Sequence, residues 1–183
     1  ESTNKSAPTP NVVPKIPESS LPPVPTQSES KTPNLILPLH QKTKRAAALK
    51  TSPRILIDTA RLRGSISLRG GTIDDLSLPG YFETLDKNSG EITLLSPKES
   101  NQGYFASHGW SGNSKQKLPD SNTLWSSNNS KLSATSPVVL SWNNGAGLIF
   151  KRTYEVDEHY MFTVKQTVQN LTESAITLYP YGL

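Results

Sequence analysis

The 183 residues include 19 lysines and arginines against 15 aspartates and glutamates, a net charge of +4, and they include no cysteine. The lack of cysteine excludes a disulfide framework, a thiolate nucleophile and a Cys-ligated zinc site. Residues 1–53 hold seven basic and three acidic residues, whereas residues 54–183 hold twelve of each, so the excess charge belongs to the first segment. A neutral second segment argues against nucleic-acid binding by a folded surface.

The first segment has the composition of a linker. Residues 1–53 hold ten of the 15 prolines and are rich in Ser, Thr, Asn and Lys. They contain too little apolar surface to offset the entropy of ordering, so we predict a disordered Pro/Ser/Lys-rich linker. Its basic run at residues 40–50 is either the solvated end of that linker or a contact for anionic lipid headgroups. No apolar run approaches the ~20 residues needed to span a bilayer.

From Arg54 onward the spacing of apolar residues is typical of β-strands. The pair Gly70–Gly71 predicts a tight turn or bulge, because glycine accepts positive φ. A short strand is expected at residues 92–95, ended by Pro97. The apolar positions with polar residues between them are Leu56, Ile66, Leu68, Ile73, Leu76 and Leu78.

The long polar stretch at residues 98–136 shows little periodicity, but its aromatic residues predict short segments that pack back onto a sheet. Beyond it, "PVVLSWNNGAGLIFKRTYEV" predicts a hairpin that turns at residues 143–147, since Asn-Gly is a strong hairpin signal. A second turn at residues 157–159 leads to another strand, and one more begins in "AITLYPYGL". No amphipathic helix is evident in residues 54–183, so we predict an all-β fold, an antiparallel β-sandwich.

No residue is predicted to be catalytic, to bind a cofactor or to bind a metal. Asp74 and Asp75 are adjacent, so in a strand they should point to opposite faces, one toward water and one toward a turn or a backbone group. The three histidines lie in the linker (His40), in a glycine-rich loop (His108) and in a turn (His159), and their spacing does not suggest converging metal ligands. Phosphate-loop, dinucleotide-binding and nucleophile-elbow motifs are absent from the sequence.

The order of the segments is more informative than any single residue. "GSISLRGGTIDDLSLPGYFETLDKNSGEITLLSP" is followed by "YFASHGW", "LPDSNTLWSS" and "VVLSWNNGAGLIFKRTYEVDEHYMFTVKQTVQN". This succession resembles the N-terminal part of the periplasmic domain of the YidC family of bacterial inner-membrane protein insertases, in its α-proteobacterial form, over about residues 61–183. The residues at positions of the family pattern are Gly64, Ile73, Asp74, Asp75, Leu76, Leu94, Leu95, Pro97, Gly109 and Trp110.

The resemblance implies a galactose-mutarotase-like super-sandwich between two transmembrane helices, on the periplasmic side of the bacterial inner membrane. Residues 1–53 would be the linker from the first helix, and residues 54–183 the N-terminal portion of the domain, incomplete at its C-terminus. The family's insertase activity belongs to a helical membrane core outside these residues. Membrane attachment is therefore expected only through segments absent from this chain.

The resemblance implies a non-enzymatic module of an insertase that assists the insertion and folding of inner-membrane proteins, alone or with the Sec translocon. Its expected partners are components of that translocon and nascent membrane proteins, contacted through sheet edges and apolar loop residues. The candidate contact residues are Tyr104, Phe105, Trp110 and Trp125, which would alternatively pack over the core. The alternative function is a carbohydrate-binding or mutarotase-like β-sandwich protein, and a third is a purely structural spacer.

Overall fold

The computed structural model describes residues 44–112 and 116–183, which contain one short α-helix, one 3₁₀ turn and eleven strands. The helical elements are α1 (Arg45–Ala48) and η1 (Leu49–Thr51). The strands are β1 (Arg54–Asp58), β2 (Arg63–Ser67), β3 (Thr72–Phe82), β4 (Glu91–Leu95), β5 (His108–Ser111), β6 (Ser126–Ser127), β7 (Lys131–Leu132), β8 (Val138–Asn143), β9 (Leu148–Val156), β10 (Phe162–Asn170) and β11 (Tyr179–Gly182). The predicted all-β class is confirmed.

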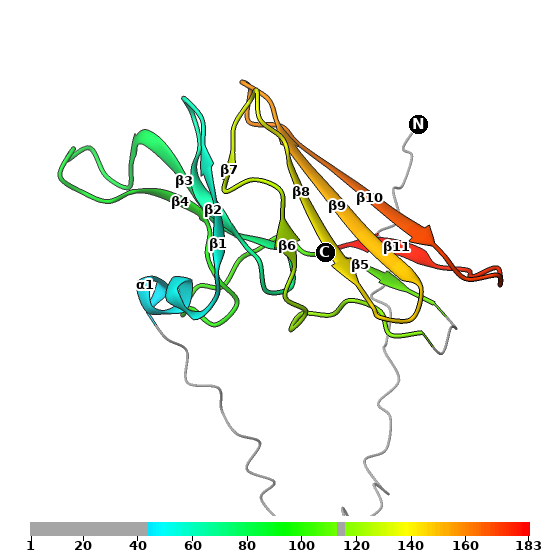
Figure 1. Cartoon of the computed structure of the whole chain (residues 1–183). Helices are drawn as coiled ribbons and strands as arrows, with labels where there is room; N and C mark the ends of the chain where they lie inside the picture. Colours follow the sequence, from blue (N-terminus) through cyan, green and yellow to red (C-terminus); the bar gives the residue numbers. More distant parts are fainter. Residues whose placement is uncertain (1–43, 113–115) are drawn as a thin grey trace, which may run out of the picture. The chain divides into compact units, whose positions relative to one another are not determined.

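The strands form two facing sheets and a smaller one (Figure 1). The first sheet has the order β4-β3-β2-β1-β7, the second has the order β10-β9-β8-β6, and β11 pairs with β5 in a third sheet of two strands. The paired strands run antiparallel, as β1 does with β2 and β8 with β9. The exception is β7, which runs parallel to β1 with Leu56 opposite Lys131. The predicted antiparallel sandwich is confirmed, and this parallel pair is a local departure from it, where a long connection lets β7 return in the same direction.

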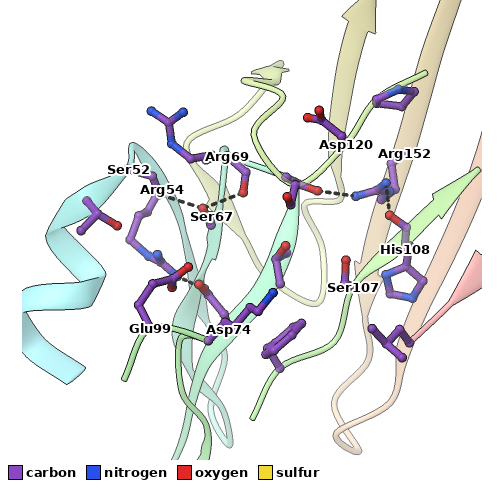
Figure 2. A pocket seen from close by; sticks show the side chains of 18 of the residues that line it. Ser52, Arg54, Ser67, Arg69, Asp74, Glu99, Ser107, His108, Asp120 and Arg152 are labelled. Carbon is purple, nitrogen blue, oxygen red and sulfur yellow. Dashed lines mark hydrogen bonds and ion pairs between the residues drawn. The ribbon is translucent and has the colours of Figure 1, made fainter. Parts of the chain in front are cut away.

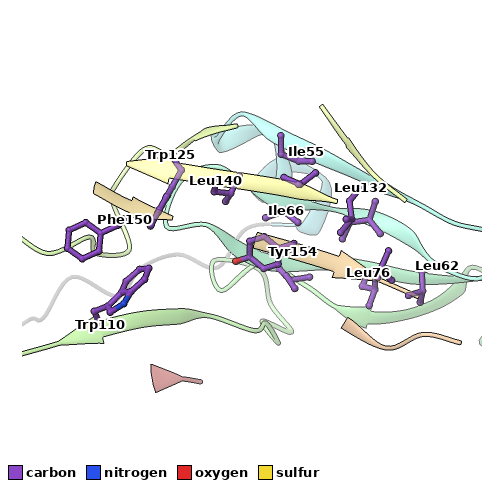
Figure 3. Close-up of a cluster of buried hydrophobic side chains, with 14 of the residues drawn as sticks. Ile55, Leu62, Ile66, Leu76, Trp110, Trp125, Leu132, Leu140, Phe150 and Tyr154 are labelled. Carbon is purple, nitrogen blue, oxygen red and sulfur yellow. The ribbon is translucent and has the colours of Figure 1, made fainter. Parts of the chain in front are cut away.

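A single apolar core lies between the two large sheets (Figure 3). The period of two residues along a strand sends alternate side chains inward, and β9 shows this most clearly, with every second residue from Leu148 to Val156 buried. On β1 the inward residues are Ile55 and Ile57, while Leu56 is 59% exposed. The other side chains that form this core include Leu62, Ile66, Leu76, Leu132, Leu140, Phe150 and Tyr154.

The turns follow the predicted glycine positions. Gly70 and Gly71, between β2 and β3, have φ angles of 74° and 61°. Gly145 and Gly147, between β8 and β9, have φ angles of 73° and 89°. In both turns the glycines have backbone angles in the left-handed region, which residues with a Cβ rarely adopt. These predicted turns are therefore confirmed.

The N-terminal boundary of the folded residues differs from the expectation. The predicted linker includes residues 44–53, but α1 and η1 lie against the first sheet (Figure 1). Ala48 is buried, Arg45 forms an ion pair with Asp75, and the Ser52 hydroxyl lies 2.7 Å from that of Ser67. These tertiary contacts hold a helix far too short to be stable alone. The rest of the predicted linker, residues 1–43, lies outside the described residues.

None of the helices in the described part of the chain is long and apolar enough to cross a membrane.

Candidate functional site

The adjacent aspartates on β3 belong to an ion-pair network, because the sheet is irregular there. Ser65 and Ile66 are consecutive on β2, but their partners on β3 are Asp75 and Ile73. Asp74 is therefore an extra residue of β3 in a β-bulge. Arg54 pairs with Asp74 and Arg45 pairs with Asp75. The prediction that one carboxylate faces water was wrong, since the two side chains are only 11% and 13% exposed.

Ser65 links the two ion pairs. Its hydroxyl donates to Asp75 Oδ2 at 2.5 Å and accepts from Arg54 Nε at 2.7 Å. Burial raises the pKa of Asp74, although the hydrogen bond and charge of Arg54 act in the opposite direction. Since each carboxylate has an arginine partner, the network fastens α1, β1, β2 and β3 together and does not present a free acid to a substrate.

A polar pocket of about 270 Å³ opens beside this network (Figure 2). Its walls come from the strands β1, β2, β3, β5, β9 and β11, from η1, and from the β2–β3 turn, the segment after β4 and the loop at residues 119–121. One wall is formed by Arg152 of β9, which is only 1% exposed. We call this cavity the Arg152 pocket. Its charged and ionisable lining residues are Arg54, Arg69, Asp74, Lys98, Glu99, His108, Asp120, Arg152 and Tyr181.

Arg152 ties three parts of the fold together. Its Nη1 donates to the carbonyls of Gly70 at 3.1 Å and Gly71 at 2.7 Å, and its Nη2 donates to the His108 carbonyl at 2.5 Å. Its guanidinium carbon lies 5.4 Å and 4.8 Å from the ring centroids of Trp110 and Trp125, within range of cation–π attraction. Sequence reasoning did not single out Arg152, yet the alternation in β9 places it on the inward face with Phe150 and Tyr154.

His108 begins β5 and is half-buried on the pocket wall. Desolvation lowers its pKa, and the positive charge of Arg152 lowers it further. When the pH falls below the ordinary pKa of histidine, His108 becomes protonated in the unfolded chain but stays neutral in the folded one. The free energy of unfolding therefore decreases with falling pH until the lowered pKa of folded His108 is reached.

We expect His108→Gln to flatten the fall in the urea midpoint between pH 7 and pH 5, because glutamine does not titrate. His159→Gln is the matched control, since His159 lies exposed in the turn before β10, where its backbone N–H donates to Asp157. A parent chain and a His108→Gln variant with the same pH slope would contradict this assignment. The linker histidine, His40, is outside the described residues.

The four aromatic candidates for partner contact separate into two groups. Trp110 and Trp125 are 6% and 2% exposed and stack at 6.2 Å between ring centroids, so they are core residues and cannot be the contact surface. Phe105 is partly buried and lines the Arg152 pocket. Tyr104 is 71% exposed and remains available to a partner.

Tyr104 lies at an edge of the first sheet that also exposes other apolar side chains. It pairs with Ser96, directly after β4, and β4 is the last strand of that sheet. Leu94 on β4 is 40% exposed, Tyr81 on β3 is 55% exposed, and Leu85 in the β3–β4 hairpin is fully exposed. We call these four residues the β4-edge surface. Scattered exposed apolar residues are common, but these four belong to neighbouring parts of the sheet, namely β3, β4, the hairpin between them and the bridge to Ser96, and together they are a candidate interaction surface.

Within residues 44–112 and 116–183, no group of three or more His, Asp or Glu side chains is placed to hold a metal ion.

Comparison with known proteins gives matches over most of the chain. Residues 54–183 match the family model described as YidC periplasmic domain. The chain is 52% identical over 139 residues to the Membrane protein insertase YidC of Methylobacterium nodulans, covering 76% of this chain and 23% of that protein. It is 49% identical over 142 residues to the protein of the same name from Bradyrhizobium diazoefficiens, with the same coverage. The match with the protein from Mesorhizobium japonicum is 50% over 140 residues, covering 75% and 23%. The chain thus spans about 23% of the length of these relatives.

Proposed function

Because this chain belongs to the family of YidC periplasmic domains, we propose that it is the periplasmic module of a membrane protein insertase. In this role it lies on the periplasmic side of the bacterial inner membrane and assists the insertion and folding of inner-membrane proteins, alone or with the Sec translocon. The observation that supports this proposal most strongly is that two comparisons agree. Residues 54–183 match the family model, and relatives about 50% identical bear the insertase name.

We propose that the module acts by binding and not by catalysis. The acidic groups at β3 are held in ion pairs with Arg45 and Arg54. Newly made membrane proteins expose apolar segments before insertion, and burial of apolar area gives roughly 25 cal/mol per Å². The β4-edge surface, with exposed Tyr81, Leu85 and Leu94, is suited to transient contact with such segments.

A photo-crosslinking experiment tests this function. Residues 54–183 replace the matching part of the insertase from Methylobacterium nodulans, and a photoreactive amino acid is placed at Leu94. We expect crosslinks to newly made membrane proteins or translocon subunits, several-fold above those from the same amino acid at Thr167. Thr167 is an exposed position on β10, in the other sheet, and serves as the matched control.

Equal crosslinking from the two positions would remove the β4-edge surface as the contact. If the graft also inserted membrane proteins no better than an insertase that lacks this domain, the proposed function itself would be refuted.

A further inference from the structure

Arg152 is a buried cation whose partners in the described part of the chain are all neutral. Its hydrogen bonds go to three backbone carbonyls and to the Tyr154 hydroxyl, and its other neighbours are the faces of two indole rings. No described carboxylate forms an ion pair with it. Arginine is rarely buried without a counter-charge, because dipoles compensate only part of the lost hydration. An anion beside this guanidinium would therefore be stabilised.

Several polar atoms around Arg152 lack a partner. Among the described residues, Arg152 Nε, Trp125 Nε1 and His108 Nδ1 are buried and make no hydrogen bond. Arg152 Nε and Trp125 Nε1 carry hydrogens and are donors. The residues among the three that line the pocket are Arg152 and His108. Buried donors without acceptors are uncommon in folded proteins, and one explanation for them is a site that binds a ligand or ion.

The remaining walls add hydroxyl groups and charged side chains that balance one another, so the one excess positive side-chain charge among the described lining residues of the pocket is that of Arg152. The hydroxyls include Thr72, Ser107 and Ser121, whereas the Ser67 hydroxyl already donates to the Arg69 carbonyl at 2.9 Å. The charges of Arg54 and Asp74 offset each other through their ion pair. The other charged side chains are Arg69, Lys98 and Arg152 against Glu99 and Asp120, and the Asp120 carboxylate already accepts hydrogen bonds from Thr123 Oγ1 and the Asn122 backbone.

We propose that the Arg152 pocket binds a small oxyanion, a carboxylate or phosphate group, with the Arg152 guanidinium as its buried charge partner. The surrounding hydroxyls supply further donors, and the positive charges of Lys98 and Arg69, two exposed lining residues, attract the anion from solvent. Figure 2 shows Arg152 and Arg69 among the lining side chains. The cavity of about 270 Å³ is smaller than the pockets that enclose drug-sized ligands. The ligand class is therefore a free oxyanion or a small molecule that carries one. This site is separate from the insertase contact proposed above.

The tryptophans stacked on Arg152 report on binding. Trp142→Phe leaves Trp110 and Trp125 as the only indoles, since the sequence has three tryptophans. Fluorescence of this 183-residue variant is followed during titration with inorganic phosphate, acetate, glucuronate or glucose, with chloride used to hold the ionic strength constant. We expect saturable changes with at least one of the three anions and none with glucose. Phosphate and the two carboxylates form separate arms, which identify the preferred oxyanion and show whether an acidic sugar binds better than acetate.

Lys98→Gln and Lys87→Gln provide a matched pair of variants. Both lysines are exposed, but Lys98 lines the pocket and Lys87 lies in the β3–β4 hairpin. We expect Lys98→Gln to weaken anion binding by about threefold, as loss of one exposed charge contact does, while Lys87→Gln leaves it unchanged. Arg152→Gln is not used as a test of binding, because loss of this buried guanidinium is expected to destabilise the fold. Signals without saturation, saturable binding of glucose, or equal effects of the two lysine changes would overturn the proposal.

Discussion

Replacing Arg152 with methionine should lower the free energy of unfolding by about 3–5 kcal/mol, although methionine keeps an unbranched apolar stem in place of the arginine methylenes. The change removes the donors to the carbonyls of Gly70, Gly71 and His108. Each buried acceptor left without a donor costs roughly 1–3 kcal/mol, and the attraction to two indole faces is also lost. Gly71 keeps one donor, because the Tyr154 hydroxyl bonds to its carbonyl at 2.6 Å.

Urea unfolding of the 183-residue chain, followed by tryptophan fluorescence, measures this effect. With slopes of about 1–3 kcal/mol per M, the midpoint should fall by at least ~1 M, or the cooperative transition should disappear. Arg69→Gln is the control, because Arg69 is exposed and its side chain forms a long hydrogen bond, at 3.5 Å, to the Asn122 carbonyl. A loss below about 1 kcal/mol for Arg152→Met would contradict the anchoring role of this arginine.

Phe150→Ala should also cost about 3–5 kcal/mol, because truncation of a fully buried phenylalanine removes transfer free energy and leaves a cavity. Phe150 is 0% exposed and makes an edge contact with Trp110 at 5.1 Å and a tilted contact with Trp142 at 5.6 Å between ring centroids. Because Trp110 also stacks on Trp125, the cavity would loosen the whole aromatic cluster beside Arg152.

The same urea measurement tests this second prediction. Leu85→Ala is its control, since Leu85 is fully exposed and its truncation should change stability by less than about 0.5 kcal/mol. If Phe150→Ala and Leu85→Ala had similar effects, the aromatic cluster would not contribute to the core as described.

The parts of the fold that were predictable from the sequence are those that local chemistry determines. Glycine pairs fix the β2–β3 and β8–β9 turns whatever lies around them, since the required φ angles exclude most other residues. The alternation from Leu148 to Val156 likewise gives both the strand and its buried face.

The parts that sequence reasoning missed depend on contacts between distant segments. A bulge at Asp74 cannot be seen in β3 alone, because it is defined by the register with β2. The docking of α1 depends on Asp75, which lies thirty positions after Arg45. Trp110 and Trp125 belong to a stretch without periodicity, and their burial depends on Phe150 and Arg152 of β9. Arg152 itself stands at an inward position of a clearly alternating strand, so a cation among buried apolar neighbours was the overlooked signal.

The parallel partnership of β1 and β7 bears on the order in which the sheet is completed. Leu56 of β1 lies opposite Lys131 of β7, and its backbone N–H donates to the carbonyl of Ser130. This pairing can form only after residues 130 and 131 have been synthesised. A chain delivered from its N-terminus therefore leaves that side of β1 open while the long intervening segment emerges. Contacts so widely separated in sequence form slowly, and an open strand edge invites pairing with other chains. Until residue 131 has been made, this open edge therefore exposes the domain to aggregation during biogenesis.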